Sequence, residues 1–133
     1  MMTRDIDLIL SLILAILIVS IFPSTLLLYS VQSYGRAEAV RDAVRFLKSS
    51  PTFRFDGIPD SIKVETVERI SPGRWRVILH FKCRHSGYGD RGGSILLPVI
   101  TPHRIEIVIN RGGVEAAVID GVWDELHQRP MGN

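Results

Sequence analysis

The segment from residue 83 to residue 93 gathers several groups that could do chemistry. It reads Cys-Arg-His-Ser-Gly-Tyr-Gly-Asp-Arg-Gly-Gly. Glycines let backbone N–H groups approach a ligand and arginine supplies charge, so the segment predicts a loop that binds a small ligand or an ion. The predicted ligand-binding residues are Arg84, His85, Tyr88, Asp90 and Arg91. The alternative is a glycine-permitted turn in which Asp90 and Arg91 form local hydrogen bonds.

The same segment matches neither the phosphate-loop nor the dinucleotide-binding pattern. Four residues could together hold a metal: Cys83, His85, His103 and His127. A Cys-x-His spacing is not a standard zinc pair. A hydrolase could use Ser86 or Cys83 as its nucleophile, but sequence neighbours rarely assemble a triad and no nucleophile elbow is present. We therefore expect no catalytic residue, no metal site and no cofactor.

An apolar stretch, residues 94–102, continues this connection with the sequence Ser-Ile-Leu-Leu-Pro-Val-Ile-Thr-Pro. Long connections in compact domains are often functional or flexible. Trp123 could likewise anchor a partner, or instead cap the sheet. The predicted partner-binding residues are Pro23, Leu96, Leu97 and Trp123.

The pattern of apolar residues predicts which elements position these segments. A helical spacing covers residues 36–49 and ends at Pro51. Alternating patterns predict four strands, over residues 62–70, 75–83, 103–110 and 114–120. One amphipathic helix packed on a four-stranded antiparallel meander is an α+β fold.

The N-terminal region carries no charged side chain from Leu8 to Gly35. A membrane span needs about 20 apolar residues, so we expect a transmembrane helix over residues 8–30, acting as an uncleaved signal anchor. A cleaved signal peptide and a buried core helix are the alternatives. The basic residues after the run place the domain in the cytoplasm by the positive-inside rule. The short N-terminal tail instead favours an extracytoplasmic domain, which is the orientation that we expect.

The expected organisation is a tail (1–7), the membrane helix (8–30), an α+β domain (36–126) and a frayed C-terminal tail (127–133). The net charge of the chain is +2, which is too small an excess to indicate nucleic-acid binding. A single Cys excludes an internal disulfide.

The order of membrane helix, amphipathic helix and antiparallel meander resembles cystatin-like and PepSY-like domains over residues 36–120. In those domains one helix lies across a curved antiparallel sheet. The Gln-x-Val-x-Gly hairpin of cystatin-type inhibitors is absent, so the resemblance implies no protease inhibition. Residues 50–62, 83–93 and 118–126 also look like segments of uncharacterised archaeal single-span membrane-anchored proteins, which bring no activity with them.

Together these patterns predict a membrane-anchored, non-catalytic interaction domain. Its expected partners are the lipid bilayer and one or more proteins of a membrane or cell-surface complex, for which it would be an accessory or structural subunit. The alternative is an extracytoplasmic sensor that binds a small ligand or an ion through the glycine-rich loop 84–93.

Overall fold

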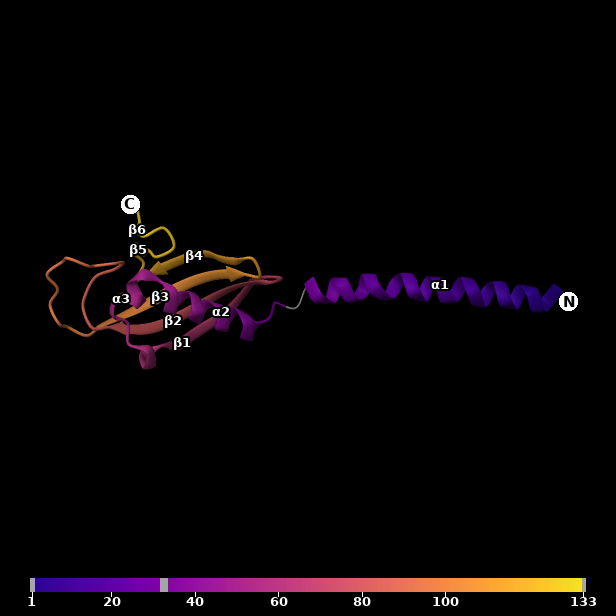
Figure 1. Ribbon diagram of the computed structural model, residues 1–133, viewed down its shortest axis with the longest axis horizontal. Helices are drawn as coiled ribbons and strands as arrows, with labels where there is room; N and C mark the ends of the chain where they lie inside the picture. Colours follow the sequence, from indigo (N-terminus) through magenta and orange to yellow (C-terminus); the bar gives the residue numbers. More distant parts are fainter. Residues whose placement is uncertain (1, 32–33, 133) are drawn as a thin grey trace. The chain divides into compact units, whose positions relative to one another are not determined.

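The structure is a computed structural model, which describes residues 2–31 and 34–132 (Figure 1). Within the first range the side chains of residues 4–19 are described. The chain divides into two compact units, residues 1–33 and 34–133.

The first unit contains the helix α1 (Met2–Val31). Among the described residues, no helix is long and apolar enough to cross a membrane. Charged side chains occupy the first turns of α1, at Arg4, Asp5 and Asp7. The expected transmembrane helix over residues 8–30 is therefore wrong, and so are the single-pass signal anchor and the membrane localisation that rested on it.

The second unit is α+β, and its sheet is larger than expected. Six antiparallel strands follow one another in sequence order. They are β1 (Lys63–Ser71), β2 (Arg74–Cys83), β3 (Thr101–Asn110), β4 (Gly113–Ile119), β5 (Trp123–Asp124) and β6 (Arg129–Pro130). The predicted four-strand sheet is wrong because β5 and β6, of two residues each, extend it. Strands this short show no alternating pattern from which a sequence could predict them.

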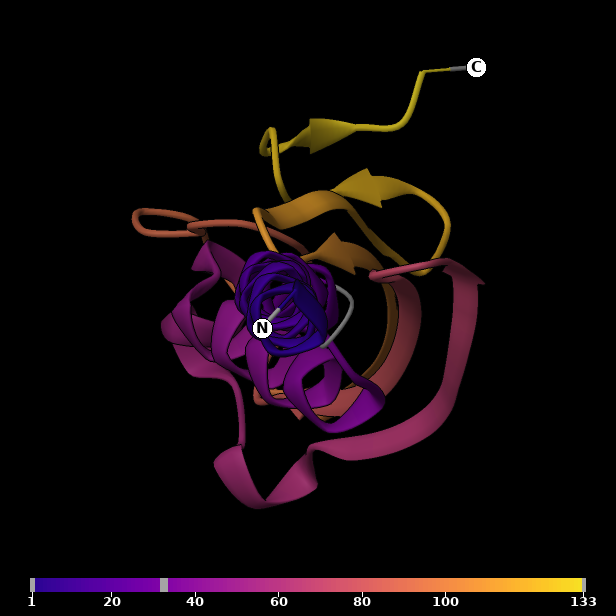
Figure 2. The ribbon, with the colours of Figure 1, turned by 90° about the vertical axis from the view of Figure 1, so that its right-hand side faces the viewer.

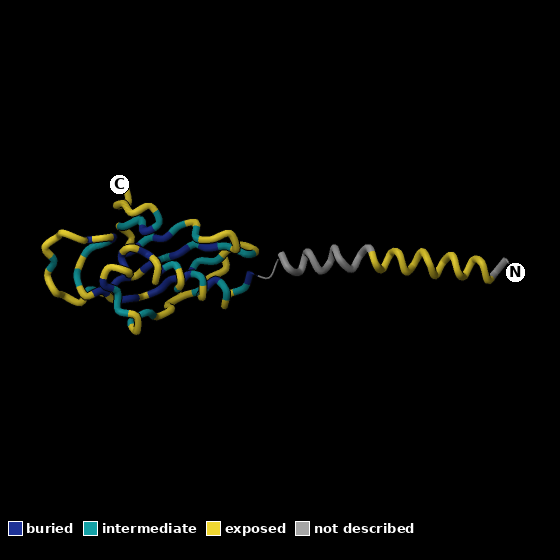
Figure 3. Tube along the Cα trace, in the orientation of Figure 1, coloured by how far each residue is buried: buried dark blue, intermediate teal, exposed yellow. Residues whose placement is uncertain are grey.

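The helix α2 (Arg36–Ser49) covers one face of the sheet, as the helical spacing over residues 36–49 predicted. Figure 2 shows α2 within the curve of the strands. Ala39, Ala43 and Leu47 are completely buried on its inner side. They pack against the inward residues of the strands, which alternate along β3 and recur along β2. Figure 3 colours the buried positions of the trace dark blue. The hydrophobic core therefore lies between α2 and this face.

Two short helices connect α2 to β1, where the sequence pattern predicted no regular element. They are α3 (Pro51–Asp56) and the 3₁₀ turn η1 (Pro59–Ser61). Proline favours the first position of a helix because its missing N–H has no partner there in any case. Pro51 therefore both ends α2 and begins α3, and it places Thr52 and Asp56 in the interior.

The opposite face of the sheet is covered by charged side chains that pair across strands. Arg76 bonds Glu68 at 2.9 Å and Glu106 at 2.8 Å. Glu65 accepts from His80 at 2.7 Å and from Arg104 at 3.0 Å. Arg74 of β2 similarly pairs with Glu115 of β4 at 2.7 Å. We call this side of β1–β4 the outer face.

The close contact of α2 with the sheet yields a first prediction. Replacing Ala43 with Leu adds volume where no part of the alanine is exposed, so it should lower the free energy of unfolding by about 1–3 kcal/mol. Urea unfolding measures this change. Lys48→Leu, on the exposed side of the same helix, is the control and should stay within about 0.5 kcal/mol of the wild type. Equal stabilities for the two variants would contradict the tight packing of α2 on the sheet.

Candidate functional site

Arg91 holds the glycine-rich loop against α3 from the inside. Its side chain is 6% exposed. Nη1 donates to the carbonyl oxygens of Ser86 at 3.0 Å and Gly87 at 2.8 Å. Nη2 donates to the Thr52 carbonyl at 3.2 Å and to Oδ1 of Asp56 at 2.7 Å. The guanidinium thus bonds to its own loop on one side and to α3 on the other.

Asp56 completes this contact with three donors. Its Oδ1 accepts from Arg91, while Oδ2 accepts from the His85 N–H at 2.7 Å and lies 2.9 Å from His85 Nδ1. Burial alone would raise the pKa of Asp56, but the His85 hydrogen bond and the charge of Arg91 outweigh it and hold the pKa below its ordinary value. The carboxylate is therefore stabilised in its charged form inside the protein.

Glu125 fixes the C-terminal segment to the same short helix. Its side chain is almost completely buried, and its oxygens accept from the Thr52 N–H at 2.9 Å, the Thr52 hydroxyl at 2.6 Å and Trp123 Nε1 at 2.8 Å. The Thr52 hydroxyl in turn accepts from the Gly89 N–H at 2.7 Å. A carboxylate with three donors at the start of a helix is well compensated for burial.

Aromatic side chains complete this end of the domain. Tyr88 stacks on Trp123 with ring centroids 5.7 Å apart, and it lies 5.5 Å from His103. Asp120 accepts from the Tyr88 hydroxyl at 3.0 Å and lies 2.7 Å from His103 Nδ1. Burial and the bond to Asp120 raise the pKa of Tyr88 to about 12. Tyr88 and Trp123 are thus half-buried packing residues that join the loop to the C-terminal segment.

The segments at residues 50–62, 83–93 and 118–126, which lie far apart in the sequence, therefore meet in one buried polar network. We call it the α3 network, and its central residues are Thr52, Asp56, Arg91 and Glu125. Of the predicted ligand-binding residues, the structure brings His85, Tyr88 and Arg91 into contacts within the protein. Arg84 and Asp90 are exposed, and Oδ1 of Asp90 accepts from the Gly92 N–H at 2.9 Å.

The groups considered for metal binding and catalysis form no reactive set. Burial, followed by the negative charge of Asp56, raises the pKa of the Cys83 thiol to about 12. A thiol in that state is a poor nucleophile. Ser86 is exposed and its carbonyl bonds to Arg91. Across the described ranges, no group of three or more His, Cys, Asp or Glu side chains could hold a metal ion.

The apolar stretch that follows the glycine-rich loop is exposed to solvent. Ile95 is fully exposed at 101%, and Leu97, Val99 and Ile100 are 75%, 54% and 64% exposed. Leu96 is half-buried. We call residues 95–100 the apolar segment. Of the predicted partner-binding residues, Leu97 lies on this surface and Trp123 is half-buried in the stack with Tyr88, whereas the side chain of Pro23 lies outside the described residues.

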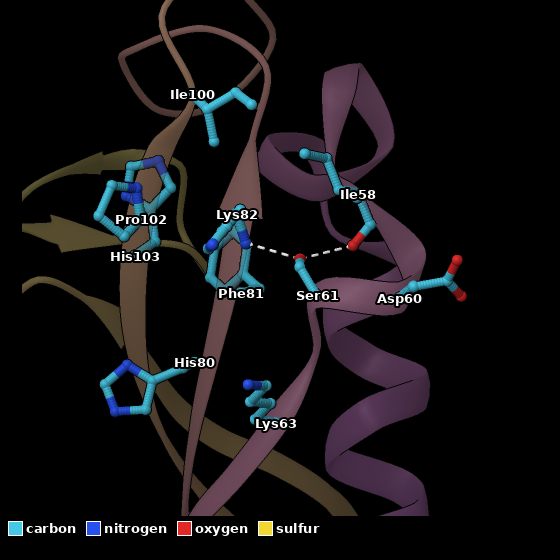
Figure 4. Close-up of a pocket in the computed structure, with 10 residues that line it drawn as sticks. All are labelled: Ile58, Asp60, Ser61, Lys63, His80, Phe81, Lys82, Ile100, Pro102 and His103. Atoms are coloured by element: carbon cyan, nitrogen blue, oxygen red, sulfur yellow. Dashed lines mark hydrogen bonds between the residues drawn. The ribbon is translucent and has the colours of Figure 1, made fainter.

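A pocket of about 510 Å³ lies beside the apolar segment, where β2 and β3 meet the η1 turn (Figure 4). Its apolar lining comes from Ile58, Phe81, Ile100 and Pro102, and its polar lining includes Lys63, His80 and Lys82. The Ser61 hydroxyl accepts from the Lys82 N–H at 2.8 Å and donates to the Ile58 carbonyl at 2.6 Å, which holds η1 against β2. The sequence pattern did not reveal this pocket because its residues come from separate stretches of the chain.

Comparisons with known proteins give no relative: no protein-family model, no curated protein and no solved structure matches the chain. The resemblance to cystatin-like and PepSY-like domains stays an expectation. The function of the chain must therefore be inferred from the geometry of its described residues.

The α3 network predicts that the stability of the domain depends strongly on the negative charge of the Glu125 carboxylate. Glu125→Gln presents an NH₂ group to donors from Thr52 and Trp123, so at least one buried donor loses its acceptor. The expected loss in free energy of unfolding is about 1–3 kcal/mol. Chemical denaturation measures it, and the exposed Glu115→Gln, which affects surface contacts with Arg74 and Asn110, should cost less than about 1 kcal/mol. A Glu125→Gln variant as stable as the wild type would show that these bonds do not hold the C-terminal segment.

The lowered pKa of Asp56 predicts how stability depends on pH. A carboxyl whose pKa is lower in the folded state adds stability above its unfolded pKa of about 3.9 and loses it as the pH falls through the folded value. The wild type should lose this contribution below about pH 4, and Asp56→Asn should be less stable at pH 7 with a flatter decline in acid. Unfolding curves over that range test this, with the exposed Asp60→Asn as the control. A decline as steep in Asp56→Asn as in the wild type would refute it.

Proposed function

We propose that residues 34–132 form a non-catalytic domain that binds a partner protein through the apolar segment. The exposure of this segment carries the proposal: four of its six residues are apolar side chains that are at least half exposed. Single exposed apolar residues are ordinary, but a contiguous run of them is typical of a binding surface. The loop that carries this run is exposed along much of its length (Figure 3).

Local hydrogen bonds fix the backbone conformation of the apolar segment. Ser94 N–H donates to the Arg91 carbonyl at 3.0 Å, so the segment starts at the α3 network. Val99 N–H donates to the Leu97 carbonyl at 2.9 Å, and the Thr101 hydroxyl donates to the Val99 carbonyl at 3.0 Å where β3 begins. A surface that is ordered before binding loses less conformational entropy when the partner arrives.

The apolar segment itself carries no charged side chain, and no Asp or Glu occurs from residue 91 to residue 104. The exposed charges that precede it have both signs, because neither Arg84 nor Asp90 has an ion pair among the described residues. Recognition therefore rests on the apolar side chains. The proposed partner is a protein with an apolar groove that takes this segment.

A capture experiment with the full-length tagged chain tests this function. The wild type and an Ile95→Asp/Leu97→Asp double variant would be incubated with extract of the native cells, and bound proteins identified by mass spectrometry. The double variant should recover at least about tenfold less of a stoichiometric partner, because a central apolar contact contributes more than about 1.4 kcal/mol. The isolated partner should then bind the purified chain directly.

Val122→Asp is the matched control, because Val122 is a half-exposed apolar residue outside the apolar segment. It should retain the partner at the wild-type level. If both variants retain it, or both lose it, the apolar segment is not the contact. Gel filtration of the chain alone covers a further outcome: a dimer that the double variant abolishes would replace the foreign partner with a second copy of this chain.

A further inference from the structure

The outer face pairs many of its charges, but not the two lysines that border the pocket. Arg74, Arg76 and Arg104 each bond a carboxylate, and His80 bonds Glu65. Lys63 and Lys82 project from β1 and β2 on the same face, and neither ammonium has an ion pair among the described residues. Both lysines line the pocket. Two unbalanced cations therefore border a hollow whose lining is mostly apolar.

The other charged groups at the pocket limit how much negative charge a ligand can carry. Asp60 of η1 lies at the rim of the pocket with its carboxylate pointing outward (Figure 4), and it has no ion pair in the part of the chain that is described. His80 already bonds Glu65 at 2.7 Å. Two ammonium groups and one carboxylate leave one positive charge uncompensated. A ligand with a single negative charge would neutralise it, whereas a second negative charge would have no cation of the pocket left to match it.

The apolar lining of the pocket indicates the chemistry of the remaining part of the ligand. Ile58, Ile100 and Pro102 border the space between η1 and the start of β3. Pockets of this size take an apolar body and use a few polar groups to orient it. The planar carboxylate accepts hydrogen bonds from two ammonium groups at once, which suits lysines on neighbouring strands.

We propose that this pocket binds a monocarboxylate attached to an apolar group, with Lys63 and Lys82 holding the carboxylate and Ile58, Ile100 and Pro102 contacting the apolar part. The carboxylate belongs either to a free small molecule or to the C-terminus of a peptide, which present the same chemistry to the pocket. This site does not depend on the protein-binding role of the apolar segment, although Ile100 belongs to both.

The lysine content of the chain gives a direct test. There are only three lysines, Lys48, Lys63 and Lys82, and Lys48 lies on the exposed side of α2. Reductive ¹³C-methylation keeps the charge of each and gives each its own NMR signal, which single Lys→Met variants assign. Titration with 4-phenylbutyrate should shift the Lys63 and Lys82 signals together and leave Lys48 unchanged. 4-Phenyl-1-butanol is the uncharged comparison and should bind at least tenfold more weakly.

A second arm distinguishes the two sources of the carboxylate. The peptide acetyl-Gly-Leu-Phe with a free C-terminus would be compared with the same peptide amidated. Tighter binding by the free peptide than by 4-phenylbutyrate assigns the pocket to protein C-termini, and the reverse order assigns it to small carboxylates. In either case Lys63→Met/Lys82→Met should weaken binding at least tenfold, while Lys48→Met should not change it.

Three results would overturn the proposal. One is the absence of any shift at Lys63 and Lys82 with both carboxylate probes. The second is equal affinity for the acid and the alcohol, which would remove the role of the charge. The third is equal loss of affinity in Lys48→Met. Because Ile95→Asp/Leu97→Asp leaves both lysines in place, its behaviour in the capture experiment separates failure of this site from failure of the protein-binding proposal.

Discussion

The ion pair between Arg91 and Asp56 is the interaction on which the candidate site depends. A guanidinium that is nearly inaccessible to water loses its hydration, so its charge and most of its N–H groups need partners within the protein. Asp56 supplies the charge, and carbonyl groups of α3 and of the loop accept most of the remaining donors. The long connection between β2 and β3 can therefore leave the sheet, pass over α3 and return without a regular element of its own.

This arrangement separates the two halves of that connection. In the glycine-rich half, Gly89 and Arg91 are buried and bond to α3, whereas Arg84, Ser86 and Asp90 are exposed. The apolar half faces solvent, which departs from the usual distribution in which apolar segments are buried. This difference favours a binding role for residues 95–100 and a structural role for Gly89 and Arg91.

The sequence predicted the elements whose patterns repeat and missed those that depend on distant partners. The core residues of β2 recur at every second position, with His80 and Lys82 on the other side, so β2 was readable despite the apolar Ile78. The helix α2 was readable from the spacing of Ala43 and Leu47. Thr52 and Glu125 showed no such pattern. They are 73 residues apart in the sequence and bond to each other only in the folded domain. The signal that could have revealed α3 was Pro51 following Ser50, a common helix start. The membrane prediction rested on the uncharged stretch from Leu8 to Gly35, whereas no helix among the described residues is long and apolar enough to cross a membrane.

The order of synthesis gives the bond between Thr52 and Glu125 a further consequence. All strand pairs join neighbours in the chain, so the sheet from β1 to β4 can assemble as it is made. Ribosomes add about 5–20 residues per second, so Glu125 is made roughly 4–15 s after Thr52. During that interval the donors of α3 must remain with water or with a temporary partner. A nascent chain held or cut before this point would carry an intact meander and an open α3 network, and such a fragment is a natural substrate for chaperones and proteases.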